Sequence, residues 1–299
     1  GYARRDLRTS GVTLPIVERV MSQPMVKATL GRLIGHASAR SVLAKAWTDA
    51  QPVLLITASI VLFLGIVTGA MYPLFEPVVA DITDVFPDSM LALFGNADFS
   101  SAEGWTQAEV LSITTPAAAA VAVIAVGTQA IAAEDSRGTL AVVLSAPISR
   151  MSYLVRKAAL LAGVIVAFSV ILLVTLMASS AVGGMGLSIE GMVAASLGLL
   201  GFSTMLGGIA FGVGAATGRS SWATWSATGI AVFGWAISAF VAINPDFRWV
   251  GFVSPFFYML DGGPSENGIP RGQWATPVAI GVVVAVAGSL AFLRRDLRK

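Results

Sequence analysis

The chain of 299 residues has no cysteine, a single histidine and few charged residues. The absence of cysteine excludes disulfide bonds and thiolate metal sites, and His36 alone cannot form a histidine metal cluster. Only 12% of the residues are charged, well below the share that is usual in a soluble domain, whereas 56% are hydrophobic. This composition predicts a membrane protein.

Charged residues and histidine are missing altogether from six apolar runs, each long enough to cross a bilayer. We therefore expect an all-α membrane protein with a six-span domain over residues 53–293, preceded by a cytoplasmic segment 1–52 and followed by a basic tail 294–299. The expected spans are 53–72, 113–133, 158–180, 191–217, 222–243 and 274–293.

Lysine and arginine are scarce on one side of this arrangement. All but two of the 19 lie in the two termini, in the segment 134–157 or at Arg219, and the exceptions are Arg248 and Arg271. Because positively charged loops remain in the cytoplasm, this bias predicts that both termini are cytoplasmic. Trp105 falls near an outer span end, where an aromatic belt is expected.

The chain also lacks the lysine of a phosphate-binding loop, G-x-x-x-x-G-K-[ST]. We therefore expect no nucleotide-binding site, no catalytic residues and no cofactor in this chain, so that ATP-driven work would need a separate ATPase. The uncharged spans do not favour an ion-coupled transporter. His36 lies outside the spans, which argues against an intramembrane protease. Nothing in the sequence indicates a nucleic-acid partner.

Residues 25–47 have apolar residues at helical spacing, with Lys27, Arg32 and Lys45 away from the apolar stripe. This pattern predicts a basic amphipathic helix that lies in the inner membrane interface and contacts lipid. The alternative is an ordinary packed helix of a small cytoplasmic domain.

Residues 247–260 are apolar but too short to cross the membrane. Pro255 interrupts them, with Phe256 and Tyr258 close behind. The segment predicts a re-entrant or interfacial outer element between the fifth and sixth spans, which either caps a pathway or lies against lipid.

The fourth span is rich in glycine. Gly208 and Gly212 form one GxxxG pair, and Gly214 and Gly218 form another. Such pairs predict close packing of helices.

The largest cytoplasmic loop between spans reads EDSRGTLAVVLSAPISRMSYLVRK, from Glu134 to Lys157. Gly138 permits a bend, Thr139 is a candidate cap for a short amphipathic helix, and Pro147 would end that helix. A short helix held between the second and third spans is suited to receive a push from a soluble partner.

This loop resembles the coupling segment of ABC-2-type permeases, the membrane subunits of one large class of ABC exporters. Weaker similarity at Phe86–Trp105, in SPFFYMLDG and in FLRRDL extends the resemblance over most of residues 40–299. It implies a cytosolic coupling helix seated on an ABC ATPase dimer, which binds ATP and magnesium. By position, the implied coupling residues are Glu134, Arg137, Gly138, Thr139, Leu140, Leu144, Ser145, Pro147, Ser149 and Arg150.

The resemblance implies a multi-pass permease of a prokaryotic inner membrane that exports a hydrophobic or amphiphilic substrate, such as a drug, an antibiotic or a lipid. Multidrug efflux is one such role. Alternatives are an ABC-2 permease for copper-enzyme maturation or cell-surface assembly and, with less support, an ion-coupled secondary transporter.

Permeases of this class need a second six-span half. The five residues RRDLR occur at Arg4–Arg8 and again at Arg294–Arg298, and the sequence starts at Gly1. We therefore consider that the chain is the second half of a doubled, 12-span permease. The alternative is that membrane topology alone demands both arginine-rich anchors. The partner half would be an identical copy, a paralogue or the front half of the same gene product.

Overall fold

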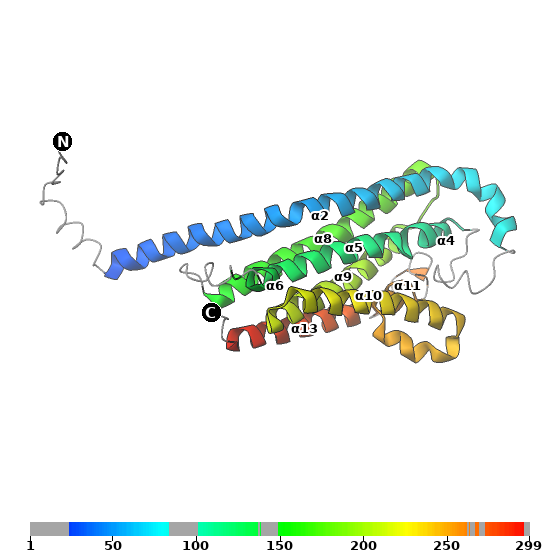
Figure 1. Cartoon of the computed structure of the whole chain (residues 1–299). Helices are drawn as coiled ribbons and strands as arrows, with labels where there is room; N and C mark the ends of the chain where they lie inside the picture. Colours follow the sequence, from blue (N-terminus) through cyan, green and yellow to red (C-terminus); the bar gives the residue numbers. More distant parts are fainter. Residues whose placement is uncertain are drawn as a thin grey trace, which may run out of the picture.

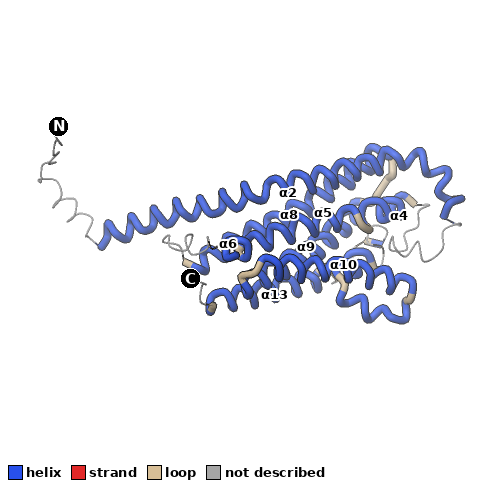
Figure 2. The backbone as a smooth tube through the Cα atoms, in the orientation of Figure 1, coloured by secondary structure: helices blue, strands red, loops and turns tan. Residues whose placement is uncertain are grey.

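The computed structural model describes residues 24–83, 101–136, 138, 149–261, 263, 267–268 and 273–295. Their regular structure is entirely helical, without a strand in these ranges (Figure 2). Within this described part of the chain, six helices are long and apolar enough to cross a membrane. The α-helices are α2 (Pro24–Thr83), α4 (Ala102–Thr106), α5 (Thr114–Ala130), α6 (Ala132–Ser136), α8 (Arg150–Gly183), α9 (Ile189–Thr217), α10 (Ser220–Ile243), α11 (Pro255–Leu260) and α13 (Ala275–Arg294).

The long helices run side by side in one bundle, with α6 and the last turn of α13 at one end and α4 and α11 at the other (Figure 1). We call these the α6 end and the α11 end. Helix α9 is central, because it packs against α5, α8, α10, α11 and α13. The bundle is thus a layer of helices around one buried helix, as expected when a single hydrophobic core is shared by all spans.

The first predicted span and the predicted interfacial helix are joined in the structure. Helix α2 runs without a break over Pro24–Thr83 and contains Pro52, Pro73 and Pro77. Its last turns bend away from the helix axis (Figure 1, cyan), in the part that holds two of these prolines, which remove backbone donors and kink helices. An interfacial position of residues 25–47 stays a prediction.

The second span begins earlier than residue 113. Helix α4 leads through a π-helix, η2 (Gln107–Leu111), into α5, and together they form a candidate span from Ala102 to Ala130. In this π-helix the Ser112 N–H donates to the Gln107 carbonyl at 2.9 Å. A sequence pattern based on the 3.6-residue period does not anticipate the wider turn.

Trp105 is buried in the bundle near the start of the second candidate span, and its place in the aromatic belt stays a prediction. Its ring stacks on Phe75 with centroids 5.5 Å apart, and its indole N–H donates to the Thr68 carbonyl at 3.2 Å. Burial removes the water that would otherwise accept a hydrogen bond from the indole N–H, and the Thr68 carbonyl takes its place. Trp105 therefore joins α4 to α2.

Candidate functional site

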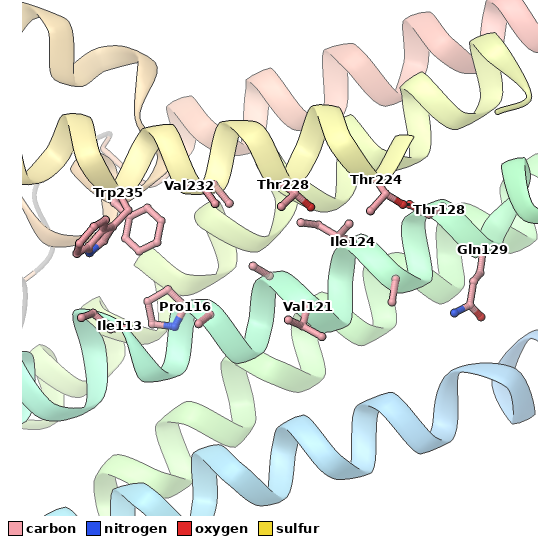
Figure 3. Close-up of a pocket in the computed structure, with 15 residues that line it drawn as sticks. Ile113, Pro116, Val121, Ile124, Thr128, Gln129, Thr224, Thr228, Val232 and Trp235 are labelled. Carbon is pink, nitrogen blue, oxygen red and sulfur yellow. The ribbon is translucent and has the colours of Figure 1, made fainter. Parts of the chain in front are cut away.

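A groove of about 750 Å³ lies between α5 and α10, and Phe256 of α11 completes its wall (Figure 3). Val121 and Val232 in its walls are more than half exposed, so the groove opens to the surface of the single chain. The lining residues are Ile113, Pro116, Ala117, Ala120, Val121, Ile124, Ala125, Thr128, Gln129, Thr224, Thr228, Ala231, Val232, Trp235 and Phe256.

Among the described residues that line the groove none is charged, and the few polar groups are unevenly placed. Thr128, Gln129 and Thr224 lie toward one end, whereas Ile113 and Trp235 lie at the other (Figure 3). The hydroxyls of Thr128 and Thr224 are 3.3 Å apart and share a hydrogen bond. Since Thr128 is in the last turn of α5, just before α6, the polar groups are at the α6 end. The groove can therefore accept a largely apolar molecule with one neutral polar end.

The sequence alone did not indicate the wall of this groove that α10 contributes. The signal was present, because Thr224, Thr228 and Trp235 recur at helical spacing on α10. When a span is apolar on all sides, its sequence does not show which face of the helix lines a groove.

The α6 end carries two ion pairs, both anchored on the short helix α6. Glu134 pairs with Lys157 of α8 at 2.8 Å, and the Tyr153 hydroxyl lies 2.6 Å from the second Glu134 oxygen. The Lys157 side chain is 3% exposed, so the Glu134 carboxylate compensates its buried ammonium in place of water. The Lys157 ammonium also lies 5.5 Å from the centre of the Tyr153 ring.

The second ion pair joins Asp135 of α6 to Arg295, just after α13. It sits on the turn between α9 and α10, where Arg295 also approaches the Ala216 carbonyl at 3.4 Å. Ser136 holds the same turn, since its hydroxyl donates to the Gly218 carbonyl at 3.2 Å. Helix α6 is thus joined to α8, to the α9–α10 turn and to the end of α13.

Of the predicted coupling residues, the structure describes Glu134, Gly138, Ser149 and Arg150. Gly138 has a φ of +71°, and its N–H donates to the Asp135 carbonyl at 3.0 Å. Ser149 caps α8 by accepting a hydrogen bond from the Ser152 N–H. The other predicted coupling residues lie outside the described residues: Arg137, Thr139, Leu140, Leu144, Ser145 and Pro147.

The four glycines singled out in the fourth span have different environments. A Cβ on Gly208 would overlap the Gly281 backbone, and one on Gly212 would overlap the Val284 backbone, so both lie where α9 approaches α13. Gly214 lies against Ala132 of α6 and Ala223 of α10. Gly218 ends α9 with a φ of +68°.

The predicted outer segment forms a 3-10 helix, η3 (Pro245–Val253), followed by α11. Pro255 occupies the first turn of α11, and Phe256 packs edge-on against Phe202 of α9 with ring centroids 4.9 Å apart. The Tyr258 hydroxyl donates to the Phe252 carbonyl at 3.0 Å, and burial raises the pKa of Tyr258. A re-entrant position in the membrane stays a prediction.

The comparison with protein families decides the class of this protein. The profile of the ABC-2 family transporter proteins matches residues 41–297. The chain belongs to this family. A search of curated proteins found no matching relative.

Membership of the ABC-2 family, together with the six apolar helices, makes the chain a multi-pass membrane protein. For the ABC-2 permease, the family implies an ABC ATPase partner and a dimeric arrangement of permease halves. In the described part of the chain, no three acidic or histidine side chains come together as a metal site.

Proposed function

We propose that this ABC-2 permease is the membrane-spanning subunit of an ATP-driven exporter for hydrophobic or amphiphilic molecules, and that the groove between α5 and α10 is its half of the pathway. The supporting observation is the groove itself, about 750 Å³ in volume, whose described lining residues carry no charge. An ion-coupled transporter would use ionisable groups along its pathway. A neutral groove is suited to apolar cargo instead.

The polar groups of the groove suggest how cargo is oriented. Positively charged segments flank the α6 end, so that end is assigned to the cytoplasm. An amphiphile would place its neutral polar head against Thr128, Gln129 and Thr224 and its apolar part toward Trp235. A lipid, an antibiotic or a drug of this shape would satisfy both ends of the groove.

The groove is open on a single chain, and a second six-span half would close it. That half is an identical copy, a paralogue or another part of the same gene product. The ATPase dimer, which binds ATP and magnesium, would dock on the loop that includes Gly138. Closure of this dimer would push the loop, move α5 and α8, and open the pathway to the outside of a prokaryotic inner membrane.

Copurification tests the ATPase partner. The native chain, purified in mild detergent, should bring with it a protein that hydrolyses ATP. Gly138→Pro should abolish this association, because proline cannot adopt a φ of +71° and has no N–H for the Asp135 carbonyl.

A matched control is Gly184→Pro at the α11 end. Gly184 has a φ of +61° and its N–H also donates to a backbone carbonyl, that of Ser180. Its substitution has a similar backbone cost but lies far from the loop, so the ATPase should stay bound. Absence of any ATPase from the native preparation would contradict the proposal.

Transport in liposomes tests the groove. With the ATPase present, Thr228→Trp should block ATP-driven movement of a fluorescent lipid, since the indole would fill the groove. Val174→Trp, on the exposed face of α8 and outside the groove, is the control and should transport normally. Equal transport by the two variants would refute the assignment of the pathway.

A further inference from the structure

We infer that Arg295 is a positioning residue that fastens together the two ends of the predicted coupling loop and connects them to the sixth span. The inference rests on the proposed function, because it assigns a role within ATP-driven transport. It concerns only residues that flank the loop on either side. Sequence reasoning had treated Arg295 as one of several basic membrane anchors.

Arg295 contacts both sides of the loop with different groups. Its guanidinium pairs with the carboxylate of Asp135, on α6 before the loop. Its backbone carbonyl accepts a hydrogen bond from Nη1 of Arg150, the first residue of α8 after the loop, at 3.1 Å. One residue at the end of α13 therefore joins segments that are separated by 14 intervening residues of chain.

This junction is partly buried and tightly built. The side chains of Asp135 and Arg295 are 11% and 22% exposed. The Arg295 guanidinium lies 5.8 Å from the centre of the Phe292 ring, a cation–π distance that fixes its direction. An ion pair that is shielded from water and held by further contacts is less weakened by solvent than one at the surface.

Gly218 provides the space for this ion pair. It has a φ of +68°, and a Cβ there would overlap both the Asp135 carboxylate and the Arg295 guanidinium. Glycine is the residue that meets both requirements, since it adopts this conformation without strain and has no side chain. The turn between α9 and α10 thus forms the floor of the junction.

A second connection joins α6 directly to α8. The carboxylate of Glu134 accepts from both Lys157 and Tyr153 of α8. A force on the loop would therefore reach α8 through Glu134 and α13 through Asp135 and Arg295. Helix α13 in turn contacts α9 along close backbone approaches, so the same force would reach the central helix.

Arg295 thus has a role that differs from docking. Loss of its guanidinium should leave the ATPase bound and active but weaken the link between ATP hydrolysis and movement of the spans. The measured quantity is the amount of substrate transported per ATP hydrolysed, in liposomes that contain the full complex. For Arg295→Gln we expect this ratio to fall about fivefold or more, which is the usual lower range of coupling between sites.

Three variants sharpen the test. Arg295→Lys keeps the charge and should retain part of the ratio, and Asp135→Asn should reproduce the Arg295→Gln effect. Combining Asp135→Asn with Arg295→Gln should cause little further loss, because both remove the same interaction. Arg294→Gln is the matched control, since it removes an adjacent exposed arginine and should leave the ratio unchanged.

The outcomes separate the inference from the proposed function. If the native chain binds no ATPase, the proposed function fails and the inference fails with it. If the native complex couples transport to hydrolysis and Arg295→Gln does so equally well, the inference alone is overturned. Loss of the ATPase from Arg295→Gln would also overturn it, because the residue would then serve docking or stability instead of coupling.

Discussion

Helices α9 and α10 follow each other in the chain, are separated by a tight turn and are both strongly apolar, yet they occupy opposite environments. In the most apolar stretch of α9, 78% is buried inside the protein, against 17% in α10. Helix α9 packs against helices on several sides, whereas α10 exposes Trp225 and Phe233 on its outer face. Hydrophobicity therefore drives both helices into the membrane but does not decide which one becomes the centre of the bundle.

The difference follows from the size of the side chains that each helix presents. Gly208 and Gly212 of α9 allow α13 to approach backbone to backbone. In a bilayer such contact is favourable, since helices there associate through packing more than through the exclusion of water. Gly229 of α10 meets no neighbouring atom within 4 Å of an added Cβ. Small residues matter only where a partner helix lies against them.

The largest difference in stability between substitutions in α9 and α10 is expected for phenylalanine. Phe202 of α9 is fully buried against Phe256, whereas Phe233 of α10 is 71% exposed. Phe202→Ala should lower the free energy of unfolding by about 3–5 kcal/mol because it leaves a cavity. Phe233→Ala removes a contact only with surrounding lipid or detergent and should leave the stability nearly unchanged.

Thermal unfolding of the two variants in the same detergent checks this expectation. The midpoint should fall markedly for Phe202→Ala and stay near the native value for Phe233→Ala. An equal fall in the unfolding midpoint of both variants would mean that α10 is also covered by protein, for instance by the second permease half.

A smaller difference in stability between substitutions in the two helices is expected for glycine. Gly208→Ala should destabilise the bundle by about 1–3 kcal/mol, since the new methyl group meets the Gly281 backbone and forces α9 and α13 apart. Gly229→Ala should be neutral or slightly stabilising, because alanine is the better helix former and has open space there. Chemical unfolding of both variants in mixed micelles measures the difference. If Gly229→Ala lowered the free energy of unfolding as much as Gly208→Ala does, close approach of α9 and α13 would not explain the effect.

The smallest effect on stability is expected for Thr224→Val, which keeps the side-chain shape but removes the hydrogen bond to Thr128. The free energy of unfolding should change by less than about 1.5 kcal/mol. Export of amphiphiles with a polar head should nevertheless weaken relative to purely apolar dyes, because the polar end of the groove is lost. Ser226→Ala is the control, since the Ser226 hydroxyl donates to the Ala223 carbonyl of its own helix. A preference that is unchanged in Thr224→Val would refute the assigned orientation of the cargo.

Span positions were predictable because a bilayer demands about 20 consecutive apolar residues, a local requirement. The starts of α9 and α10 differ from the expected limits by two residues, whereas the second span starts at Ala102 instead of 113. There the π-helix and buried Gln107 continue the span into a segment that carries Glu103 and Glu109. Burial against α2 overrides the local polarity of that segment.

The sequence showed how the charged residues are distributed along the chain but not how they pair. Lys157 and Arg295 were recognised only as cations on one side of the membrane, and Glu134 only as part of a motif. The structure joins Lys157 to Glu134 and Arg295 to Asp135, which lie 23 and 160 positions apart in the chain. No pattern of neighbouring residues contains such information.

The sequence by itself determined the class of this protein, its helical spans, the bias of its charges and its membership of the ABC-2 family, because each depends on composition, run length or local motif. Only the tertiary structure decided that α9 is central, that α5 and α10 form a groove, and that Arg295 joins α6 to the start of α8. These features depend on which faces of similar helices meet, and that choice is made by packing between segments far apart in the chain.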